Sequence, residues 1–152
     1  MSEDGVPDYA ELPLGRFLDM VASREPAPGG GASAAVAVAL AAALTGMAAR
    51  FSTDQLADAH RIADRAEGLR SRVMPLARAD AAAYGRVLDA YRSSRDDEEG
   101  RRRKVRDALS EAADVPLSIA EIGAEVAGNA ARLTEEGTPN LPAPGTAISS
   151  RA

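Results

Sequence analysis

Asp80 is the residue whose type and position most clearly require a chemical explanation. It lies four residues after Leu76 and four before Tyr84, within a stripe of apolar residues that recur at helical spacing. A carboxylate on a buried helix face is costly unless it is hydrogen-bonded, paired with a cation or open to a wet cleft. Two interpretations are about equally supported: a structural carboxylate satisfied by Tyr84 or by an arginine of another helix, or a functional carboxylate in a cleft. A shift of the helical period after Pro75 would instead leave Asp80 on the surface.

The second feature is a run of three glycines after Pro28, followed at once by a predicted helix. Glycines let the backbone approach a ligand closely, and a helix start offers free N–H groups with a partial positive charge. Gly29, Gly30 and Gly31 therefore suit a carboxylate, a phosphate or a developing oxyanion. The simpler alternative is a flexible corner between two helices, and without other context it is favoured. The run is neither a Walker loop nor a dinucleotide fingerprint, because no GK[ST] follows and no strand precedes it.

Other polar residues favour structural roles. Ser33, in the first turn after the glycines, is expected to form a hydrogen bond at the helix start, because nothing places the single histidine beside it as a base. His60 is expected on the surface. The charged run 95–104 should pair internally at i, i+4, Glu98 with Arg102 for example. No spacing of His, Cys or carboxylates predicts a metal site.

Composition indicates an all-α fold. Alanine accounts for 34 of the 152 residues, whereas aromatic residues make up only 3%. Alanine has the highest helix propensity, and a β-sandwich or barrel would need more β-branched and aromatic residues. The absence of cysteine excludes disulfides and fits a reducing compartment. The net charge of −5 argues against a nucleic-acid partner.

Location is also predicted from the sequence. No segment at the start of the chain has the pattern of a signal peptide. The low-charge stretch 26–49 is rich in Ala and Gly, and we expect it to be too weakly apolar to span a membrane. These features predict a cytoplasmic protein with no membrane partner.

Apolar periodicity predicts four helices in an antiparallel bundle of long, kinked helices. The first runs from Leu14 to about residue 23, with its apolar residues on one face (Leu14, Phe17, Leu18, Val21). The second follows the glycines to about Phe51 and is the best candidate for a central buried helix. Its larger residues share one face (Val36, Leu40, Met47, Phe51, with Leu44 close by).

The third helix is expected to begin at Thr53-Asp54, a plausible N-cap, and to end near Tyr91, with a kink at Pro75. The fourth follows a break at 93–97 and reaches about Glu136, kinked or divided by Pro116. Residues 1–11 are predicted to be a flexible N-terminus, 12–136 one helical domain, and 137–152 an irregular tail rich in Pro and Gly.

Four segments, in order, resemble one known family. They are PGGGASAA (28–35), MAARFS (47–52), the segment from Asp80 to Tyr84 (DAAAY) and AADVPL (112–117). The chain is similar, over about residues 12–141, to the cyclodeaminase domain of formiminotransferase-cyclodeaminase and to bacterial methenyltetrahydrofolate cyclohydrolases. The family often has Asn in place of Arg50 and Lys in place of Arg95.

The resemblance implies a folate one-carbon enzyme, a methenyltetrahydrofolate cyclohydrolase or a formiminotetrahydrofolate cyclodeaminase. It implies Asp80 as the catalytic carboxylate and a substrate site that includes Gly29, Gly30, Gly31, Ser33, Tyr84 and Arg95. It implies no metal, no cofactor beyond the tetrahydrofolate-type substrate, and a homodimer.

One departure from the family pattern motivates an alternative. After Asn140-Leu141 the family continues with a further Asp and a last helix, whereas this sequence continues with the segment 142–145 (PAPG) and ends soon after. The bundle is therefore expected to lack the family's last helix. The alternative function is a catalytically inactive, truncated helical homodimer of the same family.

Overall fold

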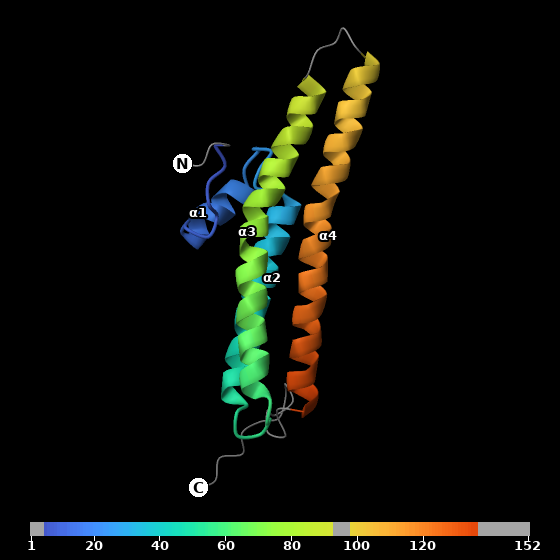
Figure 1. Ribbon diagram of the computed structural model, residues 1–152. Coiled ribbons are helices and arrows are strands. Elements are labelled where there is room, and N and C mark those ends of the chain that lie inside the picture. The colour runs from blue at the N-terminus through green and yellow to red at the C-terminus, as the bar shows by residue number, and fades with distance from the viewer. Residues whose placement is uncertain (1–4, 93–97, 137–152) are drawn as a thin grey trace.

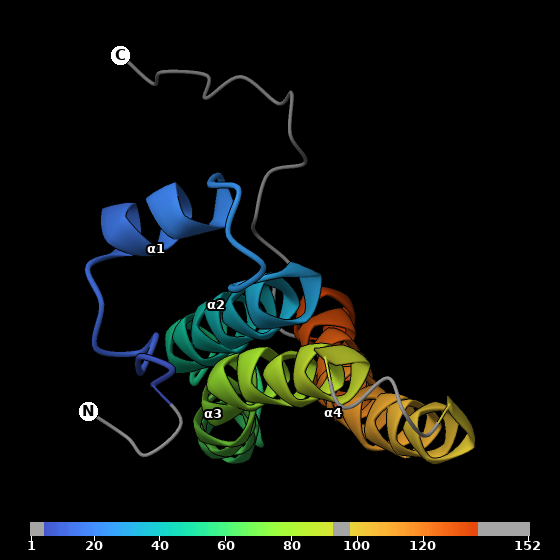
Figure 2. The ribbon, with the colours of Figure 1, turned by 90° about the horizontal axis from the view of Figure 1, so that it is seen from above.

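The computed structural model describes residues 5–92 and 98–136, and within them it contains four helices and no strand. The helices are α1 (Leu14–Val21), α2 (Gly30–Phe51), α3 (Ala59–Arg92) and α4 (Glu98–Glu136). Successive long helices run antiparallel, and α3 and α4 extend past the first turn of α2 (Figure 1). Seen from above, α2, α3 and α4 are packed together, whereas α1 lies to one side near the start of α2 (Figure 2). The predicted all-α antiparallel bundle is confirmed.

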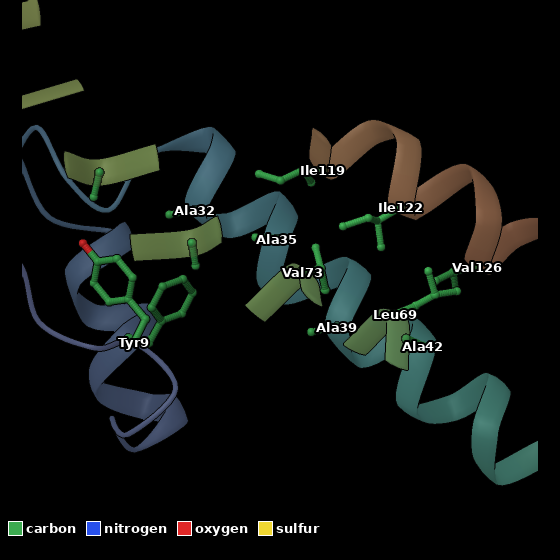
Figure 3. Close-up of a cluster of buried hydrophobic side chains, with 13 residues drawn as sticks. Tyr9, Ala32, Ala35, Ala39, Ala42, Leu69, Val73, Ile119, Ile122 and Val126 are labelled. Carbon is green, nitrogen blue, oxygen red and sulfur yellow. The ribbon is translucent and has the colours of Figure 1, made fainter. Parts of the chain in front are cut away.

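The core is formed by the small residues of α2 and larger side chains of α3 and α4. The buried residues of α2 are three or four positions apart, except for one adjacent pair, and so lie on one face of the helix (Ala32, Ala35, Ala39, Ala42, Thr45, Gly46, Ala49). Leu69 and Val73 of α3 pack on this face, and Ile119, Ile122 and Val126 of α4 approach it from the other side (Figure 3). Small side chains let the helix axes come close, so that the larger residues of the neighbours fill the space between them.

The sequence left open which face of α2 is buried, and the structure buries the alanine face. Its larger residues point outward: Leu40 is 62% exposed and Phe51 is 81% exposed. Almost every residue of α2 is apolar, so the hydrophobic pattern alone could not distinguish its faces. The choice is made by close packing, because only the alanine face allows α3 and α4 to approach.

In α1, too, most of the larger apolar side chains are exposed. Of its four predicted apolar-face residues only Phe17 is buried, and Leu14 and Leu18 are more than half exposed. Phe17 meets Tyr9 edge-on, with ring centroids 5.5 Å apart and ring planes at 68°. Tyr9 belongs to the segment predicted to be flexible, yet it is only 5% exposed. Helix α1 has eight residues and lies beside the bundle. The packing of Phe17 against Tyr9 in the hydrophobic core attaches it there.

The third helix begins later than predicted, at Ala59 rather than at Thr53-Asp54. The preceding segment is a turn in which the N–H groups of Gln55 and Leu56 donate to the carbonyl oxygen of Ser52. Asp58 then accepts hydrogen bonds from Arg61 and from Arg132 of α4, the latter at 2.9 Å. These hydrogen bonds hold the pKa of the Asp58 carboxyl below its ordinary value. Asp58 therefore connects the start of α3 to the last turns of α4.

Neither internal proline ends its helix. Both α3 and α4 are continuous through Pro75 and Pro116, so Pro116 does not divide α4 in two. Both prolines are exposed, and on that side water can satisfy the carbonyl group that loses its helical partner.

Helix α2 is also long and apolar enough to cross a membrane by length and composition alone. An 18-residue window within it has a mean hydropathy of 1.9, against the expectation from the sequence that this stretch is too weakly apolar. In the bundle, 39% of that window is buried, because α2 packs against both α3 and α4. Core helices of soluble proteins pass the same test, so the finding is weak evidence for a membrane span.

Candidate active site

Asp80 lies at the start of α2, where it caps that helix from α3. Its Oδ2 accepts a hydrogen bond from the backbone N–H of Ala32 at 3.0 Å. This N–H belongs to the first turn of α2 and has no partner within the helix, and Gly29 at the N-cap position has no side chain to offer one. The partner of Asp80 is therefore a backbone amide rather than Tyr84 or an arginine. The predicted period is correct, and it directs Asp80 into the bundle.

Gly31 is the glycine that this arrangement requires. A Cβ atom at Gly31 would lie 2.0 Å from Oδ1 of Asp80, much closer than two such atoms can approach. At Gly30 a Cβ atom would meet nothing within 4 Å, and at Gly29 it would make only an ordinary contact with the carbonyl oxygen of Pro26. The three glycines thus differ in function: the close approach of Asp80 to the backbone requires only the third to be glycine.

A cleft of about 500 Å³ opens beside this pair. Its lining comes from the loop before α2, the first turn of α2, the middle of α3 and the first half of α4 (Pro26, Ala27, Gly29, Gly30, Gly31, Asp80, Ala81, Tyr84, Leu109, Ala112, Ala113, Pro116). The walls are mostly apolar, and Asp80 is the only charged side chain among these lining residues. Such a cleft, with one polar group directed into it, is typical of a small-molecule site.

The structure brings most of the expected site residues together. Gly29, Gly30, Gly31, Asp80 and Tyr84 all line this one cleft, and Tyr84 is 46% exposed there.

Two expected substrate-binding residues are not placed in the cleft. Ser33 is not among its lining residues, and its hydroxyl donates to the carbonyl oxygen of Gly29 at 2.9 Å, as expected for a helix-start residue. Arg95 lies outside the described residues.

Sequence reasoning missed Tyr9, a buried residue that interacts electrostatically with Asp80. Burial raises the pKa of the Tyr9 hydroxyl above its ordinary value, and the negative charge of Asp80 raises it further. A tyrosine in an isolated polar segment gives no periodic signal, so nothing in the sequence could have placed it near Asp80. The wall supplied by α4 was also missed, although AADVPL contributes three of its residues (Ala112, Ala113, Pro116).

Residues suited to metal binding do not gather in the part of the chain that the structure describes. In residues 5–92 and 98–136 no group of three or more His, Cys, Asp or Glu side chains could hold a metal ion. His60 is exposed, as expected.

The helical bundle, the glycine run against Asp80 and the cleft define an all-α domain with a candidate small-molecule site, which can be compared with known proteins. Residues 13–144 match the model of the family described as formiminotransferase-cyclodeaminase. The chain belongs to this family.

Two relatives make the relationship more specific. The methenyltetrahydrofolate cyclohydrolase of Methylorubrum extorquens is 32% identical over 134 residues, which are 82% of this chain and 64% of that protein. The crystal structure of a formiminotetrahydrofolate cyclodeaminase from Thermotoga maritima matches with a TM-score of 0.76 and 37% identity, over 87% of this chain and 66% of that one. The chain thus spans just under two thirds of the length of either relative.

Proposed function

We propose that this protein is a folate one-carbon enzyme that hydrolyses methenyltetrahydrofolate at the cleft beside Asp80. The observation that carries the proposal is the Asp80 carboxylate, fixed against Gly31 and the N–H of Ala32 within an otherwise apolar cleft. The names of the two relatives support the same substrate class.

The substrate explains why a carboxylate is needed. In the methenyl form, the carbon that bridges N5 and N10 of tetrahydrofolate is part of a cationic amidine-like group. A nearby carboxylate stabilises this charge and can accept a proton from the water that attacks the carbon. The C–N5 bond then breaks as N5 takes up a proton and the new hydroxyl group loses its own, which leaves a formyl group on N10 and releases one proton overall.

The helix start controls how the carboxylate is held. The hydrogen bond from Ala32 fixes one oxygen of Asp80 at the N-terminal end of α2. An ionised carboxylate in an apolar cleft attracts a cationic ligand more strongly than one in water, because the local dielectric constant is lower. The reaction as proposed uses water and the folate substrate, with no metal and no further cofactor.

The direct test is an assay of the purified protein with 5,10-methenyltetrahydrofolate. We expect the absorbance of the methenyl form to decay faster than the uncatalysed rate, and tetrahydrofolate to bind in a calorimetric titration. Binding without catalysis would instead support the inactive homodimer of the same family. Absence of both would reject the folate site.

Cyclodeamination is the second candidate, because the chain is 37% identical to a formiminotetrahydrofolate cyclodeaminase of similar fold. In that reaction N10 attacks the formimino carbon on N5 and ammonia leaves, and Asp80 would serve as the proton-transfer group. Release of ammonia from 5-formiminotetrahydrofolate distinguishes the two reactions, since hydrolysis of the methenyl form releases none.

We further propose that the protein is a homodimer that associates through the outer face of α2. Four large apolar residues follow one another along this face at helical spacing (Leu40, Leu44, Met47, Phe51), and each is about half exposed or more. A contiguous apolar patch of this kind is typical of an interaction surface. In such a dimer the apolar surface of α2 would be covered on all sides. We therefore propose a cytoplasmic protein that has neither a membrane nor a nucleic acid as a partner.

A further inference from the structure

Pro116 lies within α4 and lines the cleft beside Asp80, together with Ala112, which is one helical turn before it. Proline has no backbone N–H, so the carbonyl oxygen of Ala112 lacks the helical partner that any other residue at position 116 would provide. Residues four positions apart lie on the same face of a helix, and here that face is a wall of the cleft. The helix continues on both sides of Pro116, so the Ala112 carbonyl group is held at this wall as a hydrogen-bond acceptor.

The cleft therefore has acceptors on two of its walls. The Asp80 carboxylate comes from α3, and the Ala112 carbonyl group comes from α4, which runs beside α3 (Figure 1). None of the described residues that line the cleft is an arginine, a lysine or a histidine, so their side chains provide no cation. Such walls suit a ligand that carries N–H donors and a positive charge better than one that carries carboxylates or phosphates.

The free carbonyl group is obtained at the expense of helix stability. A proline inside a helix removes one backbone hydrogen bond, and its ring crowds the carbonyl group four residues before it. Water satisfies this carbonyl group in the free protein, and a ligand N–H that replaces the water preserves the hydrogen bond. Local features that lower stability are typical of functional sites, where activity requires them.

From this arrangement we infer that the Ala112 carbonyl group, freed by Pro116, accepts a hydrogen bond from an N–H group of the pteridine ring of the substrate. The inference rests on the proposed function, because it places a reduced folate in this cleft with its one-carbon centre at Asp80. A reduced pteridine carries N–H donors on its ring nitrogens and on its 2-amino group. Asp80 stabilises the cationic centre from α3, and Ala112 holds the ring from α4. Pro116 acts through the backbone of Ala112 and is therefore a positioning residue.

Pro116→Ala tests this role, because alanine restores the N–H that occupies the Ala112 carbonyl group. We expect a higher melting temperature than that of the unaltered protein, since a helical hydrogen bond is regained. We also expect the KM for methenyltetrahydrofolate to rise by about fivefold, the contribution of one hydrogen bond, with little change in kcat. Pro116→Val separates the carbonyl group from the shape of the proline ring. Valine restores the same N–H and has as many side-chain carbon atoms as proline, so its KM should rise equally.

Pro75→Ala is the matched control. Pro75 lies inside α3 and frees the carbonyl group of Ser71 in the same way, but these two residues line another cavity, of about 550 Å³. The lining of that cavity shares no residue with the lining of the cleft. We therefore expect Pro75→Ala to raise the melting temperature and to leave the KM unchanged.

A binding measurement separates this inference from the proposed reaction. A tetrahydropterin that carries neither a one-carbon group nor a glutamyl tail is titrated calorimetrically into the unaltered protein and the three variants, with circular dichroism as the check on folding. Binding that is about fivefold weaker in both Pro116 variants and unchanged in Pro75→Ala supports the inference. This holds even if no folate reaction is found, in which case only the proposed function fails. Absence of pterin binding, a loss in neither or only one of the Pro116 variants, or an equal loss in Pro75→Ala would overturn the inference.

Discussion

At the scale of single residues, Gly31 and Asp80 form a pair in which neither can be enlarged without displacing the other. Asp80 Oδ1 occupies the place where any other residue at position 31 would carry its Cβ, and Oδ2 holds the Ala32 amide. The same contact therefore caps α2 and fixes the carboxylate that we propose as catalytic.

Gly31→Ala should displace the Asp80 carboxylate and remove its hydrogen bond to Ala32. We expect a loss of about 1–3 kcal/mol in the free energy of unfolding, as for other overpacked sites, and a fall in folate turnover. Gly30→Ala is the matched control for stability, because a Cβ atom there meets nothing within 4 Å. Thermal unfolding of the two variants checks this, and equal melting temperatures would show that Asp80 moves aside at no cost.

Asp80→Asn should abolish most of the activity and preserve the fold. The asparagine side chain keeps an oxygen acceptor for Ala32, but it cannot carry the negative charge or accept a proton. We expect turnover to fall by about 10²–10⁴-fold, the usual contribution of general acid–base catalysis. The measurement is the decay of methenyltetrahydrofolate, with Asp64→Asn on the exposed side of α3 as the control. A variant that retained most of its rate would remove Asp80 from the mechanism.

At the scale of elements, α2 determines the architecture through the size of its residues. Its alanine face admits the side chains of α3 and α4, and its larger residues remain outside. Because Gly30 and Gly31 open this same helix, its position relative to α3 also decides where Asp80 meets the glycines.

Ala42→Leu should therefore destabilise the bundle, whereas Ala41→Leu should be tolerated. Ala42 is fully buried, so three extra carbon atoms would force α2 away from its neighbours, at a cost of about 1–3 kcal/mol. Ala41 is exposed, and leucine is nearly as good a helix former as alanine. Chemical denaturation compares the two, and similar midpoints would contradict the close packing of α2.

At the scale of the whole molecule, the outer face of α2 is an apolar surface that the described part of the bundle leaves uncovered. Leu40 and Leu44 are its central members, at 62% and 52% exposed. If this face is the proposed dimer interface, association should bury a large apolar area, of about 2,000 Å² or more as in obligate dimers.

Leu40→Glu and Leu44→Glu should each shift the protein from dimer to monomer, because a buried unpaired carboxylate at the interface is costly. Light scattering at micromolar concentration measures the mass. Leu117→Glu is the control, since Leu117 is a similarly exposed leucine on α4, 58% exposed. A mass near 15.7 kDa for the unaltered protein would reject the dimer.

The sequence by itself determined the all-α class, most helix ends and the membership of Asp80 in a buried stripe. These features depend on local propensity and on the helical period, which act over a few residues. It also predicted that Gly29–Gly31 open a helix, and the resemblance linked them to Asp80. The start of the third helix was misplaced, because the turn after Ser52 competes with the N-cap signal at Thr53-Asp54.

Only the tertiary structure decided which face of α2 is buried, since a helix that is apolar all round has no favoured side in its sequence. It alone showed that Gly31 is the glycine fixed by sterics, because the atom that excludes a Cβ there belongs to Asp80, 49 residues further along the chain. It alone brought Tyr9 towards Asp80 and Leu109 into the wall of the cleft. Each of these contacts joins distant segments, and their distances depend on how closely the helices pack, which no local pattern specifies.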